Sequence, residues 1–283
     1  TSDKPIVMTS EKEEPGAWGG IHICGRAHTN AEGGKGSSEI GGAVYGGNDD
    51  ADNSGTLQYI RLEYTGFAFD EEHEANGISF YGVGNGTIVD HCQAYKGSDD
   101  GFEFFGGSVN VSNLVAVSCS DDSFDWTEGW NGKGTNLVAY QEAESTLGYD
   151  CDCLMECDNN GSNNAATPVA HPVLKNLILV GNGGSKQGIR LRAGTEVEID
   201  NAKVCGKGQP LTVETALTEN ALKNGTSKLT NITLTSELSC KEGIYTHADF
   251  IAVTSNKVDA NLSYSSFEDI KKECSWMNGS WVK

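Results

Sequence analysis

The sequence GISFYG at Gly77–Gly82 returns 24 residues later as GFEFFG at Gly101–Gly106, and 22 residues after that as SFDWTE at Ser123–Glu128. Two further stretches, GIHICG at Gly20–Gly25 and GIRLRAG at Gly188–Gly194, have the same form. In each stretch apolar residues alternate with other residues, and glycine stands at most of the borders. Such short alternating runs predict β-strands with one buried face. The chain therefore repeats a unit of about 22 to 25 residues.

A second strand-like run accompanies these repeats. Seven such runs begin at Tyr59, His91, Asn113, Asn136, Asn176, Asn201 and Asn231. The Leu-x-x-Leu-x-Leu spacing of leucine-rich repeats is missing, and a propeller blade needs about 40 residues. The period instead predicts an all-β fold, a right-handed parallel β-helix in which the same strands of successive coils pair. Asparagine suits its recurring place because it tolerates the left-handed conformation, and because stacked amides can form a hydrogen-bonded ladder.

The repeats predict one β-helix domain over residues 1–283. Three segments interrupt the period, and we expect them to be inserted loops at about 25–53, 142–172 and 207–228. Short helices are expected at 213–222 and 268–274. The run Lys4–Thr9 is already strand-like and no capping helix precedes it. We therefore expect either earlier coils or a partner at that edge, such as a homo-oligomer or a filament formed by end-to-end stacking.

The composition of the chain indicates which partners and which cellular location to expect. The chain has 40 acidic and 20 basic residues, for a net charge of -20, which argues against nucleic-acid binding. No stretch approaches the roughly 20 apolar residues of a membrane helix. Cysteines and Asn-x-Ser/Thr triplets favour a secreted or cell-surface protein with disulfides, and an odd number leaves one thiol unpaired or bonded to another chain. The nine candidates are Cys24, Cys92, Cys119, Cys151, Cys153, Cys157, Cys205, Cys240 and Cys274. Cys151, Cys153 and Cys157 could bind a soft metal, but we expect them to form a disulfide-stapled loop.

An acidic pattern recurs on neighbouring repeats. SDDGFE at Ser98–Glu103 is followed 22 residues later by SDDSFD at Ser120–Asp125. Equivalent residues on neighbouring coils lie one strand spacing apart, or about 4.8 Å. Carboxylates at that distance repel each other unless they are neutralised. Oxygen ligands of this kind suit Ca²⁺, so we expect a cation site formed by Asp99, Asp100, Glu103, Asp121, Asp122 and Asp125. A solvated acidic ridge is the alternative without a ligand.

Catalysis is a further alternative for the same residues. Asp99, Asp100, Asp121 and Asp122 could act as the paired acid and base of a polysaccharide hydrolase. Arg190 and Arg192 could then supply a basic subsite, and Trp126 and Trp130 could stack on sugars, although both tryptophans equally suit the core. No Gly-His-Gly motif accompanies the acids, and the Arg-x-Pro-x-x-Arg run of pectate lyases is missing.

Five motifs together resemble a family of bacterial secreted or lipid-anchored proteins with the pectin-lyase-like right-handed β-helix. They are PIVMTS at Pro5–Ser10, WGGI at Trp18–Ile21, YGGND at Tyr45–Asp49, the run Gly77–Trp130, and WMNGSW at Trp276–Trp281. The resemblance implies the fold and a surface location more firmly than an activity, and the cysteine-rich segment 142–172 departs from it. We expect a structural or adhesive surface module stabilised by cations. The alternative is a carbohydrate-active enzyme, either a hydrolase or a lyase.

Overall fold

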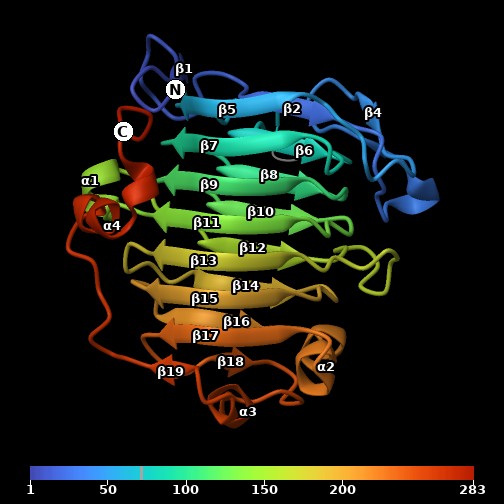
Figure 1. The fold of residues 1–283 in the computed structure, drawn as a ribbon, viewed down its shortest axis with the longest axis vertical. Coiled ribbons are helices and arrows are strands. Elements are labelled where there is room, and N and C mark those ends of the chain that lie inside the picture. The colour runs from blue at the N-terminus through green and yellow to red at the C-terminus, as the bar shows by residue number, and fades with distance from the viewer. Residues whose placement is uncertain (71–72) are drawn as a thin grey trace.

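The computed structural model describes residues 1–70 and 73–283, and it folds them as a parallel β-helix (Figure 1). One sheet has nine strands and another has eight. All strand pairs within these two sheets are parallel, as expected when each coil adds the same strands to the coil before it. The all-β prediction is therefore confirmed.

The nine-stranded sheet carries the longer strands. In spatial order they are β1 (Ile6–Met8), β5 (Thr56–Glu63), β7 (Ile88–Tyr95), β9 (Asn110–Val117), β11 (Lys133–Tyr140), β13 (Val173–Val180), β15 (Glu198–Cys205), β17 (Lys228–Leu234) and β19 (Lys257–Val258). The eight-stranded sheet consists of β2 (Ile21–Cys24), β6 (Ile78–Tyr81), β8 (Phe102–Phe105), β10 (Phe124–Thr127), β12 (Met155–Asp158), β14 (Gln187–Arg192), β16 (Gln209–Val213) and β18 (Ser239–Cys240).

The core lies between the two sheets and is built from equivalent side chains of successive coils. Phe80 pairs in register with Phe104, and their rings stack with centroids 5.0 Å apart. Phe104 stacks in turn on Trp130 at 4.1 Å. Trp126 and Trp130 are both 1% exposed, so they belong to the core and offer no face to a sugar. Stacked rings of successive coils thus form an aromatic column in the core, at distances where offset stacking is favourable.

The asparagines form the expected ladder. Asn113, Asn136, Asn176 and Asn201 all have φ between 56° and 64°. The side-chain amide of Asn136 donates to Asn113 (2.8 Å), that of Asn176 to Asn136 (3.0 Å), and that of Asn201 to Asn176 (2.9 Å). The chain of amides ends on the carboxylate of Asp90, to which Asn113 donates at 2.7 Å. Each asparagine thus serves both purposes predicted for it, the left-handed bend and the stacked hydrogen bond.

The inserted segments differ in part from their predicted bounds. Segment 25–53 leaves the coil and contains the 3₁₀ turn η1 (Glu32–Gly34) and an antiparallel pair, β3 (Gly36–Ser37) with β4 (Val44–Tyr45). Segment 142–172 contains helix α1 (Glu144–Leu147), but also the regular strand β12. Segment 207–228 likewise contains strand β16 before helix α2 (Ala216–Asn224). The helix expected at 213–222 is found as α2. The prediction of inserted loops is wrong at β12 and β16, because each of them adds a strand to the eight-stranded sheet.

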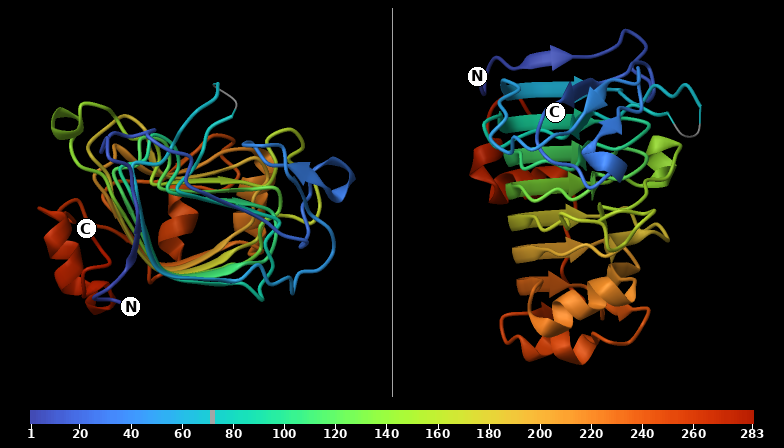
Figure 2. Two further views of the ribbon diagram at one scale, coloured as in Figure 1. Left: turned by 90° about the horizontal axis from the view of Figure 1, so that it is seen from above. Right: turned by 90° about the vertical axis from the view of Figure 1, so that its right-hand side faces the viewer.

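The C-terminal part of the chain first covers one end of the solenoid and then returns along its side. Helix α3 (His247–Ala252) closes the end beyond β17, and its Phe250 is fully buried in the core. The chain then turns back along the outside of the nine-stranded sheet through helix α4 (Phe267–Glu273) and the turn η2 (Ser275–Met277), as Figures 1 and 2 show. Both helices predicted from the sequence exist, within a few residues of their expected positions. Among the described residues, no helix has the length and apolar character needed to cross a membrane.

All nine cysteines are described, and all are free thiols. The expected disulfides, including a staple among Cys151, Cys153 and Cys157, are not formed. The reason is visible in the register, because Cys92 pairs with Leu114 on the next coil and Cys157 pairs with Leu191. Both side chains are fully buried. These cysteines fill the place of an apolar core residue, a role for which a small thiol is well suited.

Candidate functional site

The outward face of the eight-stranded sheet carries a column of carboxylates. Glu103 on β8 pairs in register with Asp125 on β10, and Asp125 pairs with Glu156 on β12. Their neighbours Phe102, Phe104 and Trp126 point into the core, so the alternation of a β-strand turns the acids outward. Arg190 on β14 follows Glu156 in the same column. Three successive coils therefore present adjacent negative charges, and the fourth presents a positive charge.

A second group of acids lies in the turn that precedes each strand. The backbone N–H of Asp122 donates to Asp100 Oδ1 at 2.9 Å, and the backbone N–H of Cys153 donates to Asp122 Oδ1 at 2.6 Å. Each of these aspartates thus binds the backbone of the following coil with one oxygen. Both are almost fully buried, at 6% and 5% exposure. Their first role is structural, since they satisfy a buried backbone donor in the turn.

The two groups meet in one cleft of about 390 Å³. Ten of its eleven lining residues are acidic, and Arg190 is the other. All six residues predicted from the sequence line it, namely Asp99, Asp100, Glu103, Asp121, Asp122 and Asp125. The structure adds four that the prediction missed: Glu39, Glu74, Asp152 and Glu156.

Two of the missed residues had a signal in the sequence. CDCLME at Cys151–Glu156 aligns with SDDSFD at Ser120–Asp125, which places Asp152 over Asp121 and Glu156 over Asp125. Reading this segment as a disulfide loop concealed the repeat. Glu39, by contrast, belongs to the inserted segment 25–53, and no periodic pattern indicates where an inserted segment folds back.

Several triads in the cleft have the spacing that a cation requires. One triad is Asp100, Glu103 and Asp125, and another is Asp122, Asp125 and Glu156; within each, the oxygens lie within 4.8 Å of one another. Ca²⁺ binds oxygens at roughly 2.3–2.6 Å, so two ligands on opposite sides of the ion are about 5 Å apart. Asp125 belongs to both triads and lies at the centre of the column. Its Oδ1 atom is buried and has no hydrogen-bond partner among the described residues.

Burial and mutual repulsion make these carboxyls hard to ionise. Loss of solvent raises the pKa of Asp99 to about 7, with a further contribution from nearby Glu74 and Asp121. The pKa of Asp121 rises to about 6, again mainly through burial, with further contributions from the carboxylates of Asp152 and Glu156. Burial also raises the pKa values of Asp100, Glu103, Asp122 and Asp125 well above their usual range, and neighbouring carboxylates add to each shift.

The arginines neutralise only one end of the column. Arg190 contacts Glu156 at 2.9 Å and Glu214 at 3.2 Å, and Arg192 contacts Glu156 at 2.8 Å and Asp158 at 2.7 Å. Both guanidinium groups are therefore committed to carboxylates of the chain itself. The part of the column around Glu103 and Asp125 forms none of these arginine ion pairs.

Comparison with curated proteins gives no match, and neither does comparison with solved structures. The family of pectate-lyase-like β-helix domains matches the chain over residues 1–283. The match extends over every coil, including the cysteine-rich segment 142–172. This chain therefore belongs to the family of pectate-lyase-like β-helix domains.

Proposed function

We propose that this chain is a secreted or cell-surface structural module whose acidic cleft binds Ca²⁺ and is stabilised by it. The observation that carries the proposal is the buried Oδ1 atom of Asp125, which lacks a hydrogen-bond partner among the described residues and is surrounded by other carboxylates. An oxygen in that position needs a proton or a cation, because a buried acceptor left unpaired is costly.

Ionisation energetics favour a cation over bare carboxylates at neutral pH. Each pKa unit between the folded and unfolded states corresponds to about 1.4 kcal/mol. Several carboxyls with strongly raised pKa values would together cost a large part of the roughly 5–15 kcal/mol that stabilises a typical domain. A divalent ion that binds only the folded chain would remove much of this repulsion by mass action.

The ligands would connect three coils. Glu103, Asp125 and Glu156 come from β8, β10 and β12, so an ion shared between the two triads would join β8 to β12, which otherwise are connected only through β10. A rigid solenoid held in this way suits a role in presenting surface loops, including adhesion. Adhesion itself is an expectation drawn from the fold.

The experiment is a thermal melt in chelator with stepwise addition of Ca²⁺ or Mg²⁺. Ca²⁺ should raise the melting temperature of the parent chain, and Asp125→Asn should abolish most of that increase. Glu237→Gln is the matched control, because Glu237 is an exposed acid outside the cleft. A parent chain whose melting temperature is the same with and without Ca²⁺ would show that the cleft is only a solvated acidic surface.

A carbohydrate-active enzyme is the second candidate, and one observation favours it. A carboxyl with a pKa of about 7, as at Asp99, is suited to donate a proton near neutral pH. Asp100 and Asp122 are less suited, because an oxygen of each accepts a backbone N–H of the next coil. Release of reducing ends or unsaturated products from neutral and acidic polysaccharides, lost in Asp99→Asn, would establish hydrolase or lyase activity.

A further inference from the structure

Strands β13 and β15 lie side by side in the nine-stranded sheet, and the turns that follow them stay in contact. Beyond the strand ends, the backbone N–H of Gly181 donates to the carbonyl of Cys205 at 2.9 Å. The next side chains that carry polar groups are those of Asn182 after β13 and Lys207 after β15. The fold thus brings an amide and an amine from adjacent coils into contact.

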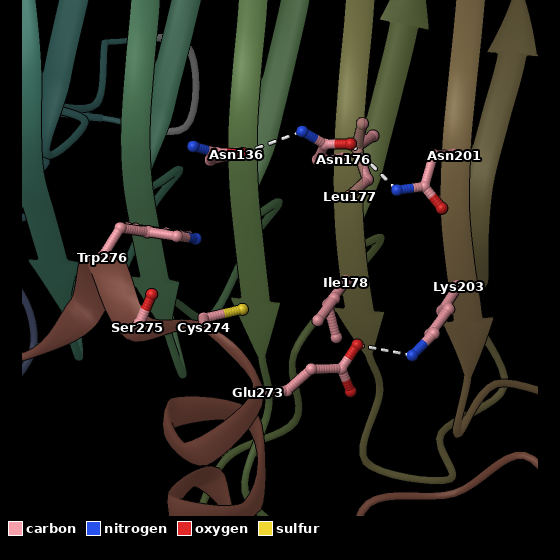
Figure 3. Close-up of a pocket in the computed structure, with 10 residues that line it drawn as sticks. All are labelled: Asn136, Asn176, Leu177, Ile178, Asn201, Lys203, Glu273, Cys274, Ser275 and Trp276. Atoms are coloured by element: carbon pink, nitrogen blue, oxygen red, sulfur yellow. Dashed lines mark hydrogen bonds and ion pairs between the residues drawn. The ribbon is translucent and has the colours of Figure 1, made fainter.

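Lys207 is the only buried lysine of the chain, whose lysines all lie within the described residues, and it is 4% exposed. Lys203 on β15, by contrast, is partly exposed and pairs with Glu273, as Figure 3 shows. Lys207 Nζ donates to the carbonyl of Cys151 and to Asn182 Oδ1, both at 3.0 Å, and forms no ion pair among the described residues. Two acceptors match a neutral amine, which keeps a lone pair, whereas an ammonium has three N–H groups to satisfy. Burial lowers the pKa of Lys207 and so favours the neutral form.

The amide of Asn182 is held in one orientation by three partners. Its Oδ1 accepts from Lys207 Nζ and from the backbone N–H of Gly184 at 3.0 Å, and its Nδ2 donates to Asp150 Oδ1 at 2.8 Å. Turned over, the amide would set its NH₂ group against a backbone N–H. Donors on the carbonyl oxygen polarise the carbonyl carbon, and the N–H of Gly184 lies at the distance of an oxyanion-hole donor.

Glycines make room for these close contacts. A Cβ atom on Gly181 would lie 2.6 Å from Lys207 Cγ, so only glycine lets the lysine side chain pass at this point. A Cβ atom on Gly184 would lie 2.9 Å from Asn182 Oδ1 and 3.0 Å from Asp150 Oδ1. The backbone is thus cleared on both sides of the amide, where the amine and the carboxylate approach it.

The amine lies close to the carbon that it could attack. Lys207 Nζ is 3.0 Å from Asn182 Oδ1, and the amide carbon Cγ is one C=O bond, about 1.2 Å, further on. The Nζ–Cγ separation is therefore at most about 4.2 Å, and a shift of about 1 Å gives a near-attack arrangement. The backbone N–H of Gly183, which could close a succinimide on Asn182, instead donates to the carbonyl of Gly206 at 2.7 Å.

We propose that Lys207 and Asn182 form an intramolecular isopeptide bond that ties two adjacent coils. The lone pair of Nζ attacks Cγ, and the N–H of Gly184 stabilises the charge that develops on Oδ1. Both nitrogens are then bonded to one carbon, so the carboxylate of Asp150 can take a proton from Nζ and pass it to Nδ2. The Cγ–Nδ2 bond breaks and ammonia leaves. One C–N bond replaces another, so no oxidant or reductant is needed.

Mass spectrometry of the full folded chain, denatured only for the measurement, tests the bond directly. The mass should be lower than that of the sequence by one molecule of ammonia. Trypsin should release a branched peptide in which residues 176–186 are joined to residues 204–223, with no cleavage after Lys207. Lys207→Arg should have the full mass, and Asp150→Asn should accumulate unlinked chain. Lys203→Arg is the matched control and should keep the loss of ammonia, because Lys203 pairs with Glu273.

Two results would overturn the proposal. One is a folded parent chain that keeps the full mass of its sequence after prolonged incubation at neutral pH. The other is a loss of ammonia that persists in Lys207→Arg and is found on a linear peptide, because that would show a succinimide between Asn182 and Gly183. The branched peptide of the parent chain needs no variant, so the test holds even if Lys207→Arg does not fold.

Discussion

Asp99 offers a direct measure of how much the acidic cleft destabilises the chain when no cation is present. Its carboxyl is 7% exposed, and its pKa rises from 3.8 to about 7 on folding, chiefly through burial. A folded pKa above the unfolded one means that the folded chain holds the proton more tightly, so stability is full below about pH 4 and is lost as pH rises toward 7. The difference of about three pKa units corresponds to about 4 kcal/mol for Asp99 alone.

The assay is urea unfolding in chelator at pH 4.5 and pH 7.5, for the parent chain, Asp99→Asn and the control Glu237→Gln. The parent and the control should be markedly less stable at the higher pH, and Asp99→Asn should lose about 3 kcal/mol less, because at pH 4.5 the carboxyl of the unfolded chain is already mostly ionised. Asp90, whose pKa is lowered to about 2 by its hydrogen bonds, acts with the opposite sign but only below this window. If Asp99→Asn keeps the whole pH dependence of the parent, then the carboxyl of Asp99 is not the strained group that the structure indicates.

Three further changes test the packing of the coils and of the C-terminal strap, residues 267–283, which packs on the outer face of the nine-stranded sheet. Phe104→Ala removes a ring from the core column and should cost about 2–5 kcal/mol in chemical unfolding; a cost below half a kcal/mol would contradict its inward position. Asn176→Ala breaks two ladder bonds at a residue with φ of 59°, and should lower the melting temperature more than Asn201→Ala, which breaks one. Trp281→Ala should remove hydrogen-exchange protection from the strap while β9 and β11 keep theirs; equal loss in both would mean that the strap and the coils unfold together.

Periodicity predicted the coils well wherever glycine marks the ends of a strand. It failed at β12, where the strand MECD alternates buried Met155 and Cys157 with outward Glu156 but has no flanking glycine. The same oversight hid Glu156 from the predicted cation ligands. The cysteines misled the prediction because their number suggests a redox compartment, whereas Cys92 and Cys157 act as apolar core residues.

The strap lay beyond sequence reasoning for a different reason. A short helix was predicted near its start, at 268–274, but its path depends on contacts such as that of Lys283 with Gln93. These two residues are separated by 190 positions and follow no repeat. A pattern of period two describes what a strand buries on its inner face. It does not tell whether the outer face, with Val138 and Ile178, meets solvent or another segment.

The asparagine ladder implies that this molecule can change length without losing its design. Asn113 and Asn136 occupy the same place on coils joined by direct hydrogen bonds, so the stretch between them is a complete module that begins and ends on matching backbone. Duplicating such a module would lengthen the solenoid by one strand spacing, about 4.8 Å. It would also duplicate Asp121, Asp122 and Asp125, so a longer descendant would carry proportionally more charge along the same face. The length of the solenoid and the number of carboxylates on this face would then increase together, because both follow the number of coils.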